Sequence, residues 1–326
     1  MSAIICLPVD FAANSLGLPS LLTETVDSAP ILYHTVSRLT LSDDYEVALL
    51  FTGENGRADA ALAREICGSL ACRYHVSAAA DVPNRELLRR SRLWSISSWR
   101  GGIGSASYYD EAGSPAAMAE AAERFGADTV GLITPDSPYA DPHLASQMLA
   151  WHHDRIRKAR VTVTGVPPGL APAFFNIEVL KAYAKGNLTL AASLLYRKEM
   201  PQRDMTATEA HFESDIELRT APWRLTVHSP RQLAMVRALT AAGLSPRTAK
   251  SLDVVRALAA DWRITAGDVP AKVEIEPTSR FDAVPFYMRV FAAGRVQSDM
   301  SVDDFTRIVE SMSPHNDVVL SLEGLG

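Results

Sequence analysis

The chain has 326 residues, 47% of them hydrophobic, and a formal net charge of -6 at pH 7. This length allows two domains or one large domain, and the acidic balance argues against a general nucleic-acid surface. No apolar run approaches the length that spans a membrane. The three cysteines (Cys6, Cys67 and Cys72) have the spacing of neither a disulfide framework nor a zinc site, and no basic leader opens the chain. We therefore predict a cytoplasmic protein with free thiols.

Strands alternate with helices along the first three quarters of the chain. Apolar patterns predict strands at residues 3–9, 46–51, 73–77, 93–97, 129–134, 160–165 and 223–228. Helices are predicted at 30–39, 57–70, 86–90, 114–125, 143–159, 176–185, 188–196 and 231–242. The alternation predicts a layered α/β fold with a mostly parallel sheet. We place a domain boundary near Gly243, which gives domains 1–243 and 244–326.

One buried strand leads directly into a turn that carries an acid. The run from Thr129 to Thr134 is apolar enough for a strand covered on both faces, and the proline-rich turn after it contains Asp136. An acid at this end of a parallel strand lies where open α/β sheets bind ligands. An equally good interpretation is that Asp136 caps the turn. Asp141, directly before Pro142, is predicted to cap the next helix.

Two further features have weaker signals. Residues 100–105, Arg-Gly-Gly-Ile-Gly-Ser, form a glycine-rich stretch that could cradle a phosphate or a sugar. The stretch lacks the spacing of a P-loop or a dinucleotide fingerprint, so a flexible connection is the alternative. His152 and His153 are adjacent on a predicted helix and point about 100° apart, so we place them on the surface rather than in a shared metal site.

Four stretches in the first 240 residues resemble one family. Gly126 to Pro142 is similar to the motif Ala-Asp-x-Val-x-Arg-x-Thr-x-Asp-x-Pro-Leu-x-Asp-Pro of the spore coat polysaccharide cytidylyltransferases, which are relatives of acylneuraminate cytidylyltransferases. Trp99 to Gly101, Thr164 to Leu170 and Trp223 to Pro230 match further motifs in the family's order. The resemblance implies a GT-A-like nucleotidyltransferase fold.

The resemblance also implies a site. In such enzymes a nucleoside triphosphate and an acidic sugar meet over Mg²⁺, and the sugar oxygen displaces pyrophosphate. The resemblance assigns the metal and catalysis to Asp136, and a further catalytic position to His228. The positions that it assigns to nucleotide binding are Leu7, Pro8, Arg100, Gly101, Gly102 and Gly169.

The sequence departs from this family at three places in the same site. No Lys or Arg occurs before Arg38, although the family's first loop is basic. His228 stands where the family has a metal-binding Asp, and imidazole is a poor Mg²⁺ ligand. The loop near Ala173 lacks an acid that is common in relatives. These departures favour a degenerate site that no longer transfers a nucleotidyl group.

The last third resembles the start of a radical SAM partial barrel. Lys272 to Arg280 looks like the strand before the cluster loop, and residues 317–326 look like a later strand with a glycine-rich SAM motif. Phe281, Pro285 and Met288 stand at the three cysteine positions, so an iron–sulfur cluster is not expected. Nucleotidyltransferase-like domains joined to radical SAM–SPASM modules are a known architecture, and a partial barrel leaves edges uncovered. We therefore expect a longer natural protein.

Three functions remain open at this point. The first is an active Mg²⁺-dependent sugar cytidylyltransferase. The second is a catalytically silent module that holds a nucleotide, a sugar or a peptide for a radical SAM–SPASM enzyme. The third is a glycosyltransferase, which the spacing of Asp136 and Asp141 disfavours because it is not Asp-x-Asp. The predicted partners are a nucleotide or sugar, a radical SAM domain or a peptide, and a second copy in a homodimer; neither nucleic acid nor membrane is expected.

Overall fold

The computed structural model describes residues 2–15, 17–79, 113–155, 160–190, 210–265, 270, 272–277, 299–312 and 318–322. The chain forms two compact units, Met1–Thr265 and Ala266–Gly326. Arg100, Gly101, Gly102, Phe281, Pro285 and Met288 lie outside the described residues, as do the strand and helix expected between residues 86 and 97.

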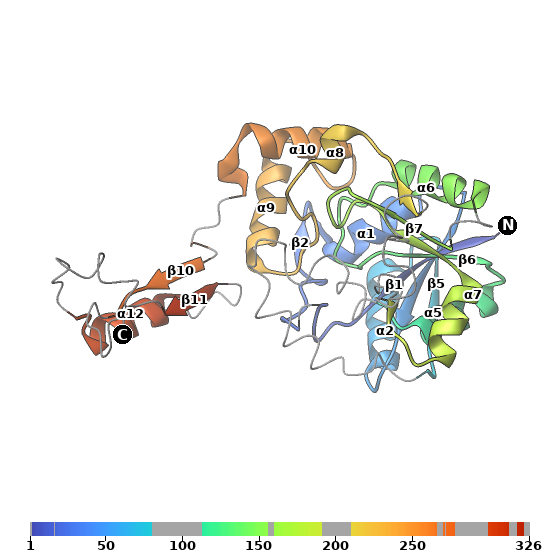
Figure 1. Cartoon of the computed structure of the whole chain (residues 1–326), viewed down its shortest axis with the longest axis horizontal. Helices are drawn as coiled ribbons and strands as arrows, with labels where there is room; N and C mark the ends of the chain where they lie inside the picture. Colours follow the sequence, from blue (N-terminus) through green and yellow to red (C-terminus); the bar gives the residue numbers. More distant parts are fainter. Residues whose placement is uncertain are drawn as a thin grey trace, which may run out of the picture. The chain divides into compact units, whose positions relative to one another are not determined.

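A mixed sheet with the strand order β5-β4-β1-β6-β8-β7-β9 organises the first unit (Figure 1). Its strands are β1 (Ala3–Pro8), β4 (Glu46–Phe51), β5 (Cys72–Val76), β6 (Thr129–Leu132), β7 (Val161–Thr164), β8 (Ala173–Asn176) and β9 (His211–Phe212). β5, β4, β1 and β6 are mutually parallel, and β8 is antiparallel to both β6 and β7. A small antiparallel pair, β2 (Thr25–Val26) and β3 (Ala29–Pro30), precedes the first helix. The expected mostly parallel α/β sheet is confirmed.

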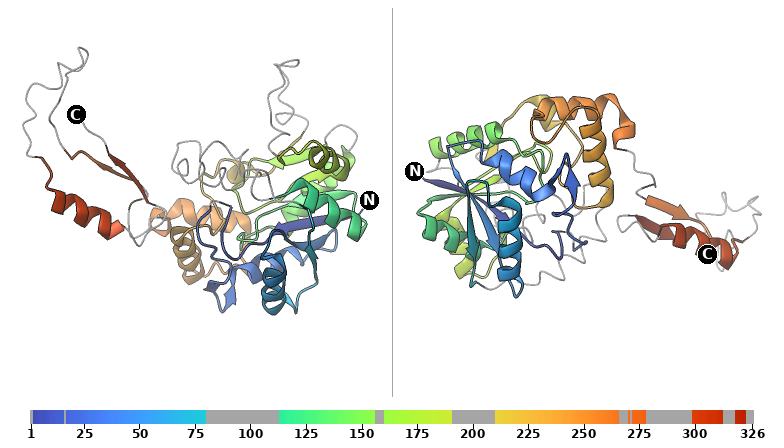
Figure 2. Two further views of the ribbon diagram at one scale, coloured as in Figure 1. Left: turned by 90° about the horizontal axis from the view of Figure 1, so that it is seen from below. Right: turned by 180° about the vertical axis from the view of Figure 1, so that it is seen from behind.

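Helices cover both faces of this sheet (Figure 2). The helices are α1 (Ile31–Leu39), α2 (Gly56–Cys67), α5 (Pro115–Phe125), α6 (Pro142–Asp154), α7 (Ile177–Lys185), α8 (Ile216–Arg219), α9 (Pro230–Ala241) and α10 (Ser251–Ala260). Alternation along β1 explains the two layers, because successive side chains of a strand point to opposite faces. Ile5 and Leu7 pack with α1, α2, α6 and α9, whereas Ile4 and Cys6 pack with α5 and α7.

Local chemistry sets the ends of the helices beside the site. The Ser114 side chain accepts a hydrogen bond from the Ala117 amide at the start of α5, and Gly126 ends that helix at a φ of 71°. Asp141 Oδ1 accepts from the amides of His143 and Leu144, at 3.0 and 3.1 Å, and so caps α6 as expected. The turn that carries Asp136 is therefore held between β6 and a capped helix.

Two local expectations were wrong. Residues 223–228 do not form a strand; this extended segment instead donates from the Leu225 amide to Pro168 O and from the Val227 amide to Asp136 O. His152 is fully buried rather than on the surface. Its ring nitrogens lie 2.7 Å from Thr162 Oγ1 and 2.7 Å from Asn176 Oδ1, because α6 packs on β7 and β8.

Residues 244–265 belong to the first unit, so that unit ends later than the expected boundary near Gly243. The Tyr139 hydroxyl donates to Leu244 O at 2.8 Å, and the buried Arg38 guanidinium donates to Pro246 O at 2.8 Å. Ser251 also donates to the carboxylate of Asp141. These bonds fasten the segment to the turn after β6, which the apolar periodicity along the chain could not show.

The second unit contains a parallel strand pair and one described helix. β10 (Lys272–Ile275) pairs with β11 (Val319–Leu322), with Lys272 opposite Val319, and α12 (Val302–Met312) lies between them in the sequence. The two strands lie within the stretches that the sequence pattern likened to strands. In the part of the chain that the structure describes, no helix is long and apolar enough to span a bilayer.

Candidate functional site

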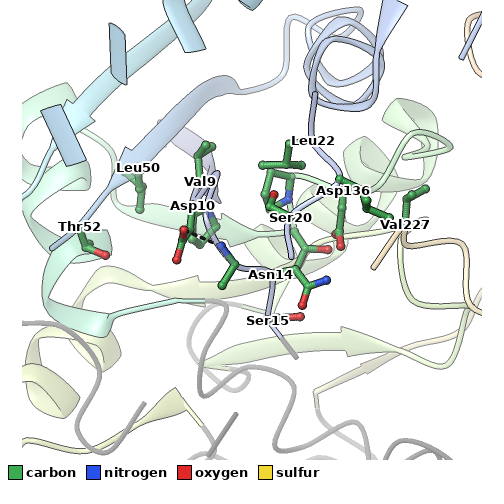
Figure 3. Close-up of a pocket in the computed structure, with 15 residues that line it drawn as sticks. Val9, Asp10, Asn14, Ser15, Ser20, Leu22, Leu50, Thr52, Asp136 and Val227 are labelled. Carbon is green, nitrogen blue, oxygen red and sulfur yellow. Dashed lines mark hydrogen bonds between the residues drawn. The ribbon is translucent and has the colours of Figure 1, made fainter. Parts of the chain in front are cut away.

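A pocket opens at the carboxyl ends of three neighbouring parallel strands (Figure 3). Parallel pairing aligns Pro8 with Leu50 and Cys6 with Leu132, so β1, β4 and β6 end at one edge of the sheet. The pocket is lined by Pro8, Val9, Asp10, Ala13, Asn14, Ser15, Ser20, Leu21, Leu22, Leu50, Thr52, Thr134, Pro135, Asp136 and Val227. Open α/β sheets bind ligands at this edge, which makes the pocket the candidate site.

Asp136 is the most perturbed group of the pocket. The residue is 5% exposed, and its Oδ1 atom has no hydrogen-bond partner among the described residues. Burial raises the pKa of the Asp136 carboxyl from 3.8 to about 6, and a hydrogen bond from Thr134 partly opposes this effect. The carboxylate therefore lacks one of the donors that a buried charge needs, and a bound group could supply it.

The loop after β1 is ordered by its own polar side chains. Asp10 Oδ1 accepts from the amides of Ala12 and Ala13, at 2.9 and 3.0 Å. Asn14 Oδ1 accepts from the Leu18 amide at 3.1 Å, and Asn14 Nδ2 donates to His228 O at 2.7 Å. In Figure 3, Asn14 is drawn between Asp10 and Asp136. The loop thus brings a second acid to the pocket and is tied to the segment that ends at His228.

His228 and Leu7 contribute to the surroundings of the pocket rather than to its lining. The His228 side chain is buried, with Nδ1 3.0 Å from Thr226 Oγ1, and the residue of its segment that lines the pocket is Val227. Leu7 is wholly buried in the core. Of the sequence-derived site residues that the structure describes, Pro8 and Asp136 come together in the lining.

Gly169 allows a close approach between two backbone segments. Its φ is +98°, and a Cβ atom there would lie 2.7 Å from Leu225 C and 2.8 Å from Leu225 O. Only glycine fits at such a position. The described contacts of Gly169 therefore position the 223–228 segment, and with it the Val227 amide that donates to Asp136 O at 2.7 Å.

No protein-family profile and no curated protein matches this sequence. Among solved structures, a cytidylyltransferase from Leptospira borgpetersenii matches with a TM-score of 0.54 and 14% identity, over 82% of this chain and 98% of that chain. The fold of this chain is therefore similar to that of this cytidylyltransferase. CMP:2-keto-3-deoxy-manno-octonic acid synthetase complexed with CTP matches with a TM-score of 0.45 and 13% identity, over 75% of this chain and 100% of that chain. At these low sequence identities, the similarity concerns the fold alone.

The described donor atoms around the pocket do not form a ready Mg²⁺ site. Mg²⁺ prefers oxygen ligands in near-ideal octahedral geometry and is usually held by one or two carboxylates. The described residues contain no group of three or more His, Cys, Asp or Glu side chains that could hold a metal. Asp10 is already engaged by its own turn, which leaves Asp136 Oδ1 as the carboxylate atom without a partner in the described part of the site.

Sequence reasoning missed most of the polar lining. The sequence patterns did not place Asp10, Asn14, Ser15, Ser20 or Thr52 in a site. The available signal was position, because the loop of residues 9–22 and Thr52 follow directly after predicted strands. Which of these side chains faces the pocket depends on how the loop folds back over the sheet.

Proposed function

We propose that the first unit is a nucleotidyltransferase-like binding module that holds a nucleotide- or sugar-type ligand without transferring a nucleotidyl group. The observation that supports this proposal is the charge of the pocket. Its described lining contains Asp10 and Asp136 and no Lys, Arg or His. Phosphoryl transfer depends on positive groups that stabilise the developing negative charge, and this lining supplies the opposite sign.

The state of Asp136 strengthens the argument. With a pKa of about 6, its carboxyl is mostly ionised at neutral pH. A triphosphate placed here would meet a buried negative charge in surroundings where charges are poorly screened. The His228 ring lies beside Thr226, with Nδ1 3.0 Å from Thr226 Oγ1, and His228 is not among the described residues that line the pocket.

One observation favours the active Mg²⁺-dependent cytidylyltransferase as a second candidate. Asp136 Oδ1 has no hydrogen-bond partner among the described residues, which is the condition expected of an oxygen atom that binds a metal ion. In that case Asp136 would hold Mg²⁺ together with phosphate oxygens and waters, and the ion would supply the positive charge that the lining lacks.

The arrangement of the second unit supports a role beside a radical SAM–SPASM enzyme. Two parallel strands with a helix between them form one repeat of a βαβ architecture, and such a repeat does not close a barrel by itself. We propose that this unit belongs to a larger barrel and that the first unit presents a ligand or a peptide to it.

A calorimetric titration of the full chain with CTP, with and without Mg²⁺, tests the first proposal, together with the other three nucleoside triphosphates. Cytidine and neutral hexoses provide phosphate-free ligands in the same assay. We expect no Mg²⁺-dependent binding of any triphosphate and no pyrophosphate release with acidic sugars. Pyrophosphate release that is lost in Asp136→Ala but retained in Asp43→Ala, at an exposed acid, would instead establish the active enzyme.

A further inference from the structure

The charge and shape of the pocket point to one kind of chemical group. Asp136 is 95% buried, as its 5% exposure shows, and it lines the pocket with Oδ1 lacking a partner in the described residues. Asp10 adds a second carboxylate to the same lining. We propose that this pocket receives a primary ammonium group, the charged end of a ligand whose remainder lies outside it. The inference rests on the binding-module function proposed above.

An ammonium group fits both the Asp136 Oδ1 atom, which lacks a partner among the described residues, and the acidic lining of the pocket. Its N–H groups donate hydrogen bonds, so one of them can pair with Asp136 Oδ1. Its positive charge offsets the two carboxylates, which no cation of the described lining does. A hydroxyl group would supply the hydrogen bond but would bring no positive charge to the buried Asp136 carboxylate. A phosphate group provides neither the hydrogen-bond donor nor the positive charge, because at neutral pH its oxygens mainly accept hydrogen bonds and carry negative charge.

A third acid extends the negative field beside the pocket. Asp59, in the first turn of α2, is partly buried; burial raises the pKa of its carboxyl, and the charge of Asp10 adds to the effect. The amino end of a helix often attracts anions, but here that end carries an acid of its own. The region around Asp10 therefore favours a cation.

The size and surface of the cavity favour an organic cation over a hydrated metal ion. The cavity volume is about 40 Å³, and on this measure one water needs roughly 10–15 Å³, so about three or four heavy atoms fit. An aminomethyl group has this size, whereas Mg²⁺ usually keeps several of its waters. Much of the lining is apolar, including Val9, Leu22, Leu50 and Val227, and would contact the carbon atoms next to the nitrogen.

Two small probes of nearly equal size distinguish binding of an ammonium group from binding of a hydroxyl group. The full chain, labelled with ¹⁵N, is titrated with ethanolamine hydrochloride and, separately, with ethylene glycol, which replaces the ammonium by a hydroxyl. Ionic strength is matched with potassium chloride, and amide chemical shifts are followed by NMR. We expect ethanolamine to shift the amides of Val9, Leu22 and Val227, and ethylene glycol to leave them in place.

Charge-neutral variants of the same shape complete the experiment. Asp136→Asn should weaken the ethanolamine response about tenfold or more, since it removes the charge that pairs with the ammonium. Asp10→Asn keeps the acceptor atom of its turn and should give a smaller loss, whereas the exposed control Asp43→Asn should change nothing.

Three results would overturn the proposal: equal responses to both probes, no response to ethanolamine, or a response to MgCl₂ at these amides that ethanolamine does not produce. The outcome is read at the pocket amides and needs no turnover. Pyrophosphate release from CTP would therefore end the binding-module proposal without being confused with a failure of ammonium binding.

Discussion

The free energy of unfolding should depend on pH through Asp136 in a defined direction. Burial raises the pKa of the Asp136 carboxyl to about 6, so the folded chain holds this proton over a range in which the unfolded chain has already released it. The folded state therefore binds more protons between the two pKa values, and its stability falls as pH rises through this window. The change Asp136→Asn removes the titrating group while keeping its shape.

The size of the effect follows from the two pKa values. The difference between 3.8 and about 6 corresponds to about 3 kcal/mol of stability lost at high pH. Between about pH 4.5 and pH 8, the stability of Asp136→Asn relative to the natural chain should rise by about 2 kcal/mol. The absolute difference at one pH also includes the fit of the new amide, so the slope with pH is the test.

Urea unfolding followed by tryptophan fluorescence measures this slope. All five tryptophans lie at or before residue 262, so the signal reports on the first unit. The exposed Asp43→Asn serves as the control for removal of one negative charge. If the stability curves of Asp136→Asn and the natural chain run parallel from about pH 4.5 to pH 8, the Asp136 carboxyl is not the perturbed group that its burial implies.

Three other substitutions test the contacts that hold the site. His152→Leu should cost about 1–3 kcal/mol, since it removes the hydrogen bonds to the buried Thr162 and the partly buried Asn176. Burial lowers the pKa of His152 to about 4, so the natural chain should lose stability as pH falls below 6.5. Gly169→Ala should cost about 2 kcal/mol or more, because its φ is positive and its Cβ meets Leu225. Tyr139→Phe should cost about 1 kcal/mol through the lost bond to Leu244 O. Urea unfolding checks all three, and unchanged midpoints would contradict the assigned contacts.

The sequence identified the elements whose signals are local. An unbroken apolar run marked β1, a four-residue apolar spacing marked α2, and the pair Ser114 and Gly126 marked both ends of α5. The position of Asp136 after β6 followed from the proline that stops the strand. These features depend on neighbours in the chain, so their physical causes are present in the sequence itself.

The missed features depend on partners far away in the chain. β8 is a four-residue strand directly before α7, and it is a strand because it pairs with β6 and β7. The 223–228 segment has a strand-like pattern but bonds to the turns at Pro168 and Asp136 instead of entering the sheet. The segment has the residue pattern of a strand, but its conformation is set by the hydrogen-bond partners that the fold places beside it.

The pattern of residues along the chain was enough to predict the α/β class, the order of the main strands and helices, and the placement of an acid at the end of a buried strand. The folded chain was needed to show that Asp136 is almost completely buried, that Asp10 and Asn14 line the same pocket, and that His152 is buried. Burial and electrostatic environment arise from packing between distant segments, and a pattern along one chain does not record that packing. The charge of the pocket, on which the proposed ligand chemistry rests, is for this reason a property of the folded chain.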